Sequence, residues 1–236
     1  MIYVMSDIHG NIRAYNNIIE QINFGLDDTL YIIGDIIDRG KSGIALLRKF
    51  MLMKNVKVLM GNHELMMLNY MHSSDQRDRF LWHINGGEIT ENLFFKLDLN
   101  TRNDIINYLE SLPYEKTIKV NNKNYLLVHA APGYIYKHHW KYYDSYESYM
   151  VWHRLDSGDY YEIKGNNTVI HGHTPTNQWS LLKGHKESII QYYENTINID
   201  CGIGFPGKDE NGVKSRLACL RLDDMKEFYN KEVRKK

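Results

Sequence analysis

The sequence predicts an α/β (α+β) protein built from two packed mixed β-sheets flanked by helices. Two observations lead to this prediction. Over the first 70 residues, short apolar runs rich in β-branched residues alternate with segments of helical spacing, which is typical of a largely parallel sheet with crossover helices. After Pro113, apolar runs follow one another over short polar links, which is typical of hairpins. Crossovers early and hairpins late indicate two sheets packed on each other.

The first part of the chain should contain three strands and three helices. The strands are expected at residues 2–5, 30–33 and 56–60. The helices are expected to begin at Asn11 and Ser42, which are good capping residues, and directly after the third strand. In the first helix, Ala14, Ile18 and Ile22 have the spacing of one buried face.

The later elements differ in character. Residues 75–112 are expected to be helical and more polar, with Pro113 closing the segment. An Asn-rich turn should join two strands of a hairpin, and four more strands should follow. The strands of this part are expected at 117–120, 125–128, 168–170, 188–193, 196–199 and 216–222. Residues 133–165 are dense in Tyr, His and Trp and show no clean period, and residues 226–236 are interpreted as a solvated helix end.

The composition excludes several classes of protein. The 29 acidic and 29 basic residues balance, so neither nucleic acid nor a membrane surface is indicated as a partner. No signal peptide or membrane span is visible, and Cys201 and Cys219 are expected to be buried, reduced thiols. With no repeat or linker, we expect one catalytic domain over residues 1–236 in a cytoplasmic protein. The oligomeric state stays open.

Five of the expected strands end in residues that bind metals. These residues are Asp7 and His9, Asp35 and Asp38, Asn62 and His63, His129, and His171 and His173. Open α/β sheets place their sites at the carboxyl ends of strands, so the side chains should meet at one edge. Carboxylate, imidazole and amide oxygen together suit Mn²⁺, Fe²⁺ or Zn²⁺, and two such ions about 3.5–4 Å apart form a clamp for displacement at phosphorus. Spacing alone does not decide between Asn62 and His63 as ligand, or between Asp35 and Asp38 as bridge.

These residues also carry a family resemblance. Asp7-Ile8-His9-Gly10, Gly34-Asp35-Ile36-Ile37-Asp38-Arg39-Gly40 and Gly61-Asn62-His63-Glu64 resemble the three signature blocks of the PPP-type metallophosphatases, which have the calcineurin-like phosphoesterase fold. Further similar runs are Trp82-His83-Ile84-Asn85-Gly86-Gly87, Val128-His129-Ala130, Trp152-His153-Arg154, Gly172-His173-Thr174-Pro175 and Ile199-Asp200-Cys201-Gly202. Over residues 1–205 the chain is similar to the compact bacterial and phage branch that includes the bacteriophage lambda serine/threonine protein phosphatase. The resemblance implies a four-layer metallophosphoesterase sandwich.

The resemblance implies two divalent ions per chain, with Mn²⁺ favoured and Fe²⁺ or Zn²⁺ as alternatives. Asp7 and His9 would bind one ion. Asn62, His129 and His173 would bind the other. Asp35 would bridge the two, and a hydroxide held between the ions would attack phosphorus in line.

The remaining roles belong to catalysis and phosphate binding. His63 would be the general acid, and Asp38 would orient it and favour its imidazolium form. Arg39 and Arg154, together with Asn62, would hold the phosphoryl oxygens. Glu64 is expected to pair with one of these arginines. Should Arg154 not fill this role, Arg102, Lys137 and Lys141 are the alternatives.

Some features depart from the family pattern or are left over. Ser6 stands where Gly is usual before the first Asp, and we expect no effect on the turn. His171 is expected to have a hydrogen-bonded structural role. Adjacent histidines usually point apart, so His138, His139 and His153 are not expected to bind a third metal. The tyrosine-rich run 142–149 fits a substrate surface and a packed lid equally well.

The function implied is that of a metal-dependent phosphomonoesterase. Phosphoserine and phosphothreonine in proteins or peptides are the expected substrates, with phosphotyrosine and small aryl phosphates also accepted. A symmetrical diadenosine tetraphosphate hydrolase, or another nucleotide phosphohydrolase, is the enzymatic alternative. That family resembles this one but lacks the second Asp of the second block and ends its third block in Asp, whereas Asp38 and Glu64 follow the protein-phosphatase pattern. A non-catalytic scaffold is disfavoured because every expected ligand is present.

Overall fold

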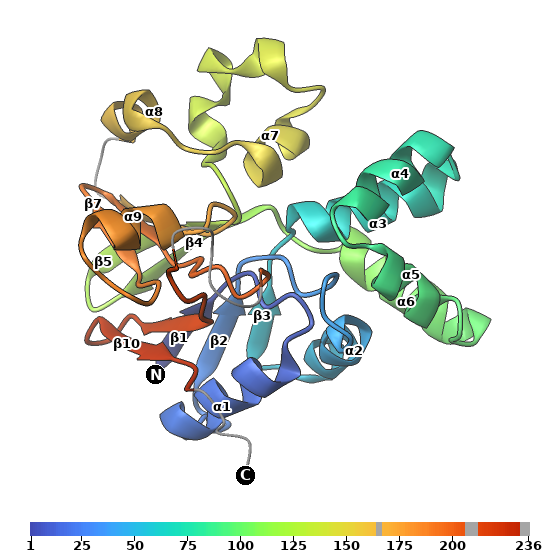
Figure 1. Ribbon diagram of the computed structural model, residues 1–236, viewed down its shortest axis with the longest axis horizontal. Helices are drawn as coiled ribbons and strands as arrows, with labels where there is room; N and C mark the ends of the chain where they lie inside the picture. Colours follow the sequence, from blue (N-terminus) through green and yellow to red (C-terminus); the bar gives the residue numbers. More distant parts are fainter. Residues whose placement is uncertain (164–166, 206–211, 232–236) are drawn as a thin grey trace.

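The computed structural model describes residues 1–163, 167–205 and 212–231, and two five-stranded sheets form its centre (Figure 1). The first sheet has the order β10-β9-β1-β2-β3. Its strands are β1 (Ile2–Met5), β2 (Thr29–Ile32), β3 (Val56–Val58), β9 (Ala218–Arg221) and β10 (Lys226–Tyr229). Strands β1, β2 and β3 run parallel, and β9 pairs antiparallel with both β1 and β10.

The second sheet has the order β4-β5-β6-β8-β7. Its strands are β4 (Glu115–Val120), β5 (Lys123–Val128), β6 (Asn167–His171), β7 (Gln191–Tyr193) and β8 (Thr196–Asn198). The middle strands β5, β6 and β8 are parallel, while β4 and β7 form antiparallel edges. Asn121 and Asn122 both have positive φ in the β4–β5 turn, which is the conformation that Asn tolerates and that a tight two-residue hairpin requires.

Helices cover the outer faces of the two sheets. The helices on the side of the first sheet are α1 (Ile12–Ile22), α2 (Gly43–Leu52), α3 (Asn62–Ser73), α4 (Gln76–Ile84), α5 (Glu88–Phe94) and α6 (Leu99–Glu110). Asn11 begins α1 by accepting a hydrogen bond from the N–H of Ala14 at 3.1 Å, as expected of an Asn cap. Helices α4, α5 and α6 confirm the helical content expected over residues 75–112.

The core divides as a layered sandwich requires. In β1, Val4 faces the second sheet and packs in one cluster with Leu127 and Ile170, whereas Tyr3 and Met5 face the helices. This alternation is the period of two of a strand buried on both faces. A third cluster, which includes Val169 of β6, lies on the outer face of the second sheet. The expected arrangement of two sheets with helices outside is confirmed.

Some boundaries expected from the sequence are wrong. The helix end expected at the C-terminus is instead the edge strand β10, because Phe228 and Tyr229 pack on opposite sides of the sheet; residues 232–236 lie outside the described part. The expected strand 188–193 is reduced to Gln191–Tyr193, and the helix α9 (Asn177–Leu182) was not expected. The aromatic segment contains four short helices, η1 (Gly133–His138), η2 (Trp140–Tyr142), α7 (Tyr146–Trp152) and α8 (Ser157–Glu162). In the described ranges, no helix has the length and apolar character needed to cross a membrane.

Candidate active site

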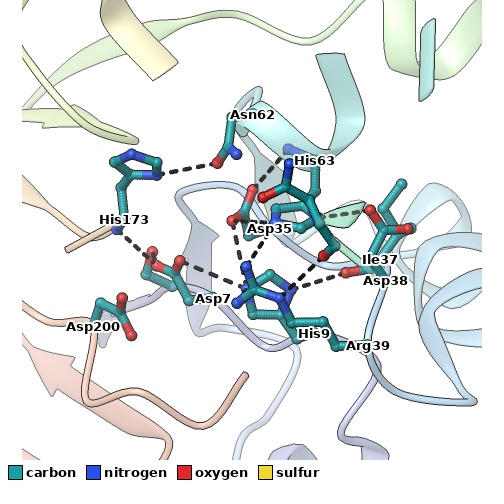
Figure 2. Close-up of polar contacts among 12 residues, drawn as sticks. Asp7, His9, Asp35, Ile37, Asp38, Arg39, Asn62, His63, His173 and Asp200 are labelled. Carbon is teal, nitrogen blue, oxygen red and sulfur yellow. Dashed lines mark hydrogen bonds and ion pairs between the residues drawn. The ribbon is translucent and has the colours of Figure 1, made fainter. Parts of the chain in front are cut away.

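The carboxyl ends of five strands meet at one edge, as predicted. Asp7 follows β1, Asp35 follows β2, Asn62 opens α3 after β3, and His129 and His173 follow β5 and β6. Figure 2 shows most of these side chains pointing toward one another. All of them are at least 93% buried. The first sheet supplies one half of the site and the second sheet supplies His129 and His173.

One group of donors surrounds His9. Its Nε2 lies 3.5 Å from Asp35 Oδ2 and 4.0 Å from Asp7 Oδ1. Its Nδ1 lies 3.1 Å from the backbone oxygen of Ile37. That carbonyl can only accept, so Nδ1 carries the proton and Nε2 presents a lone pair to the carboxylates, which is the usual arrangement of a ligand histidine.

A second group surrounds Asn62. Its Oδ1 lies 2.9 Å from His129 Nε2 and 3.1 Å from His173 Nδ1. Asp35 Oδ1 lies 3.5 Å from His129 Nε2. His129 Nδ1 lies 2.8 Å from the carbonyl of Ile33, so the same argument frees its Nε2 for a ligand.

Asp35 is placed to bridge the two groups, because Oδ2 faces His9 and Oδ1 faces His129. Asp38 is not, since its Oδ2 is 2.6 Å from His63 Nδ1. The same contact occupies Nδ1 of His63, whereas Asn62 Oδ1 faces both histidines of the second group. The geometry thus favours Asp35 and Asn62 over Asp38 and His63, the choice that spacing left open.

The donors fit divalent cations. Burial, and then the nearby carboxylates of Asp7 and Glu64, raises the pKa of Asp35 well above its usual value. Burial and Asp7 raise the pKa of Asp200 in the same way. Among the described residues, no Lys or Arg forms an ion pair with Asp7, Asp35 or Asp200. Buried carboxylates are costly without a partner, and two bound cations would supply one.

The His63–Asp38 pair is held from several sides. Trp82 Nε1 donates to Asp38 Oδ2 at 2.8 Å, and the N–H of Asp38 donates to Thr90 Oγ1 at 2.9 Å. Burial raises the pKa of Asp38 to about 7. Burial, and then the charge of Arg39, lowers the pKa of His63 well below its usual value. The expectation that Asp38 favours the imidazolium form of His63 is thus opposed by burial and by the charge of Arg39.

Both expected arginines reach this edge. Arg39 Nη1 lies 3.0 Å from His9 Nε2, and its Nη2 lies 3.1 Å from His63 Nε2. The guanidinium therefore covers the two histidines, and its carbon lies 4.2 Å from the ring centre of Phe205. Arg154 Nη1 donates to the backbone oxygen of His173 at 3.3 Å. The cavity that these side chains enclose has a volume of about 40 Å³, and Arg39 and Arg154 both line it.

The backbone is strained at the site. Asp7, His9, Asp35, Asp38, Arg39 and His173 all have φ between 44° and 68°. Non-glycine residues rarely adopt this region, and such strain clusters at functional sites. At Gly34, where φ is 91°, an added Cβ would lie 2.6 Å from His129 Nδ1, so only Gly fits before Asp35.

Glu64 has a different role from the one expected. It pairs with neither arginine, and its carboxylate accepts three backbone N–H groups from residues 35–37, at 2.8, 2.9 and 3.2 Å. It lies on the first turn of α3 and is fully buried. Glu64 thus fixes the loop that carries Asp35 and Asp38.

The remaining residues for which the sequence raised an expectation lie partly at this site and partly away from it. Ser6 Oγ contacts the Asp7 carboxylate, and the turn forms as expected. His171 is buried with its Nδ1 3.3 Å from the Gly172 oxygen. Arg102 and Lys141 lie against Phe95 and Trp140 instead of the metal edge, and Lys137 lies within η1. In the tyrosine-rich run Tyr149 is fully buried, as in a packed segment, whereas Tyr142 is 79% exposed.

Asp200 and Trp82 also belong to this site; both stand in runs that resemble the family, but no role was expected for either. Asp200 lines the cavity next to Asp7. It follows β8, which is parallel to β6, so the strand-end rule could have found it. Trp82 lies 44 residues from Asp38 along the chain, and no local pattern indicates that contact.

An α/β sandwich with buried donors at one edge, Asp35 between two groups and a His–Asp pair beside them, defines a metallophosphoesterase. A family model described as calcineurin-like phosphoesterase matches residues 1–200. The chain therefore belongs to the calcineurin-like phosphoesterase family, whose members use a dinuclear metal site, and it is a hydrolase of phosphoesters.

Curated relatives bear two kinds of name. Serine/threonine-protein phosphatase 2 of Salmonella typhimurium strain LT2 is 30% identical over 73% of this chain and 78% of that protein. The protein of the same name in Escherichia coli strain K12 is 28% identical over 85% of this chain and 87% of its own length. A symmetrical bis(5'-nucleosyl)-tetraphosphatase of Baumannia cicadellinicola is 30% identical, but the match spans 55% of this chain and 41% of that protein.

Solved structures show the same fold. A putative diadenosine tetraphosphatase has a TM-score of 0.64 at 16% identity, over 97% of this chain and 91% of that chain. A serine/threonine phosphatase of Saccharomyces cerevisiae has a TM-score of 0.63 at 15% identity, over 100% of this chain and 81% of that chain. At such identities the likeness concerns the fold alone.

Proposed function

We propose that this enzyme removes phosphate from phosphoserine and phosphothreonine in proteins, and that it also accepts phosphotyrosine and small aryl phosphates. The observation that carries the proposal is the Asp38–His63 contact of 2.6 Å beside the metal donors. An alkoxide leaving group, such as that of serine, needs a proton as it departs, and an oriented imidazole can supply it. The relatives named protein phosphatases support this choice because they match this chain over most of their length.

The proposed ligands are Asp7, His9 and Asp35 for one ion, and Asp35, Asn62, His129 and His173 for the other. When bound, the two ions would supply Lewis acidity and would lower the pKa of a coordinated water to near neutrality. We propose Mn²⁺ as the resident metal, since mixed carboxylate, amide and imidazole donors suit it, with Fe²⁺ or Zn²⁺ as alternatives. We also retain the proposal of a cytoplasmic location, which two free, buried cysteines fit.

The chain's own residues do the remaining work. Arg39 leaves His9 and His63 when phosphate enters and pairs with its oxygens, because a guanidinium fork matches phosphate geometry. Arg154 and the amide of Asn62 approach from the other side. The incoming negative charge raises the pKa of His63, whose Nε2 then holds a proton toward the leaving oxygen while Asp38 keeps the ring oriented.

The nucleotide alternative is tested in the same assay. Protein stripped with chelator and reloaded with Mn²⁺ is compared on a phosphothreonine peptide and on diadenosine tetraphosphate, each as kcat/KM. We expect the peptide to be preferred. We expect Asp38→Asn to reduce peptide turnover by at least tenfold, because the mutation removes the partner that orients His63. A diadenosine tetraphosphate kcat/KM far above that of the peptide would replace this proposal with the nucleotide hydrolase.

A further inference from the structure

A second group of metal-binding side chains lies outside the active site, within the segment of short helices over residues 133–163. His139 Nε2 lies 2.7 Å from Asp159 Oδ1, and His153 Nε2 lies 2.7 Å from Asp159 Oδ2. The three donor atoms lie within 4.8 Å of one another. We propose that His139, His153 and Asp159 form a third metal site, which takes a divalent transition ion such as Zn²⁺.

The adjacent histidines His138 and His139 contact different partners, and this does not exclude a site. His138 turns to Glu162 at 3.2 Å, whereas His139 turns to Asp159. The second histidine of the group is His153, 14 residues further along the chain. No sequence pattern indicates this pairing, because only the fold of the segment brings the rings of His139 and His153 to a centroid separation of 4.3 Å.

The surroundings of the group are those of a ligand set. Two imidazoles and one carboxylate suit Zn²⁺ or a similar ion, with an open position for water. His153 Nδ1 lies 2.9 Å from Tyr143 Oη, which fixes the ring from behind as second-layer partners of metal ligands do. The Asp159 side chain is 2% exposed, and that of His139 is 20% exposed. The carboxylate is thus buried and the open side of the site faces solvent at His139.

Asp159 is prepared to bind a cation. The N–H of Asp156 donates to Asp159 Oδ2 at 2.9 Å and holds the carboxylate in place, facing both imidazoles. The contacts of 2.7 Å are hydrogen-bond distances, so an ion would take the place of the hydrogen between each Nε2 and Asp159. Each displaced proton would pass to Nδ1 of the same ring or to solvent, and the rings would move back by a fraction of an ångström.

The position of the group suggests what the ion would do. His139 lies between η1 and η2, His153 ends α7, and Asp159 lies in α8. These helices have between three and seven residues, which is too short for stability without tertiary support. Figure 1 shows α7 and α8 together on one side of the molecule, apart from α1 and α2. One ion would hold together the η1–η2 junction, the end of α7 and α8. It would also restrict Arg154, which follows His153 directly.

The test counts metal on the full chain. Chelator-stripped protein is dialysed against a defined excess of Zn²⁺, and the bound zinc per chain is measured by elemental analysis. We expect His139→Asn to bind one ion fewer than wild type. His138→Asn is the matched control, because it removes the adjacent histidine that lies outside the group, and it should bind as many ions as wild type.

Two further measurements keep the test decisive. Asp159→Asn preserves the shape of the side chain and should also lose one ion, which covers the case that His139→Asn fails to fold. Zn²⁺ should slow proteolytic cleavage between residues 133 and 163 in wild type and in the His138 variant only. Equal zinc content in wild type, His139→Asn and Asp159→Asn, or no zinc-dependent protection, would overturn the proposal and leave a hydrogen-bonded lock of the three side chains.

Discussion

His63 shows how one residue combines a sequence signal with a geometry that the sequence does not contain. The block Gly61-Asn62-His63-Glu64 indicates its neighbourhood to the metal donors. The contact with Asp38 and the cover by Arg39 come from the fold. Together they hold the imidazole of His63 between a carboxylate and a guanidinium, and burial with the charge of Arg39 lowers its pKa.

We expect His63→Ala to lower kcat on phosphoserine peptides by two to four orders of magnitude, which is the usual range for loss of a general acid. The loss on p-nitrophenyl phosphate should be much smaller, because nitrophenolate leaves without a proton. Steady-state kinetics on both substrates measure the difference. His72→Ala serves as control, since it removes an exposed histidine of the same helix. Equal losses on both substrates would contradict the acid role.

Trp82 contacts the His63–Asp38 pair through Asp38, to which its indole N–H donates. Trp82→Phe removes the N–H that donates to Asp38 but keeps most of the ring in the core. We expect kcat on phosphopeptides to fall about tenfold, equivalent to about 1.4 kcal/mol, because Asp38 then orients His63 less firmly. A kcat unchanged within twofold, in protein of unchanged circular dichroism, would show that Trp82 is only a packing residue.

At the scale of elements, the carboxyl ends of the strands determine where the site forms. Alternating apolar runs and helical spacing were enough to predict β1, β2, β3, β5 and β6 and the meeting of their ends, because parallel strands place those ends at one edge by geometry. The same patterns could not give β10 or the contact of Glu64 with the loop at residues 35–37. Those depend on which surface is left uncovered and on which backbone groups lack partners, and both are properties of the assembled fold.

Glu64 offers a direct test of this coupling between elements. In Glu64→Gln, the amide NH₂ replaces one acceptor oxygen, so at least one buried N–H of the loop loses its partner. We expect a loss of about 2 kcal/mol in the free energy of unfolding, or roughly 6 °C in Tm, together with weaker metal binding because Asp35 is less well held. Thermal unfolding and metal titration measure the two effects.

Glu110→Gln is the control for that change, since Glu110 is a partly exposed carboxylate that contacts His72. It should leave both Tm and metal affinity within experimental error. If Glu64→Gln lowers Tm but leaves metal affinity unchanged, Glu64 stabilises the fold without setting the position of Asp35.

At the scale of the whole molecule, the active site is also the place where the two sheets are joined. Asp7, His9 and Asp35 come from the first sheet, and His129 and His173 come from the second. The apolar cluster around Val4 and Leu127 also links the facing surfaces of the two sheets. Metal binding at the proposed ligands should therefore stabilise the complete sandwich as well as supply the chemistry.

We expect removal of the metals to lower Tm in one cooperative transition. Each site contributes about 2.7 kcal/mol when the free ion is at 100 times its Kd, so two sites correspond to roughly 15 °C in a chain of this size. The measurement is made in the His139→Asn background, so that the active site alone is observed.

Asp35→Asn in that background should lose both ions and most of the stabilisation, because one carboxylate serves both groups. His129→Ala should lose the second ion and retain the first. If the chelated and Mn²⁺-loaded proteins unfold at the same temperature although two ions are bound, the ions bind the unfolded chain as well as the folded one, and the stabilising role of the metals between the sheets is contradicted.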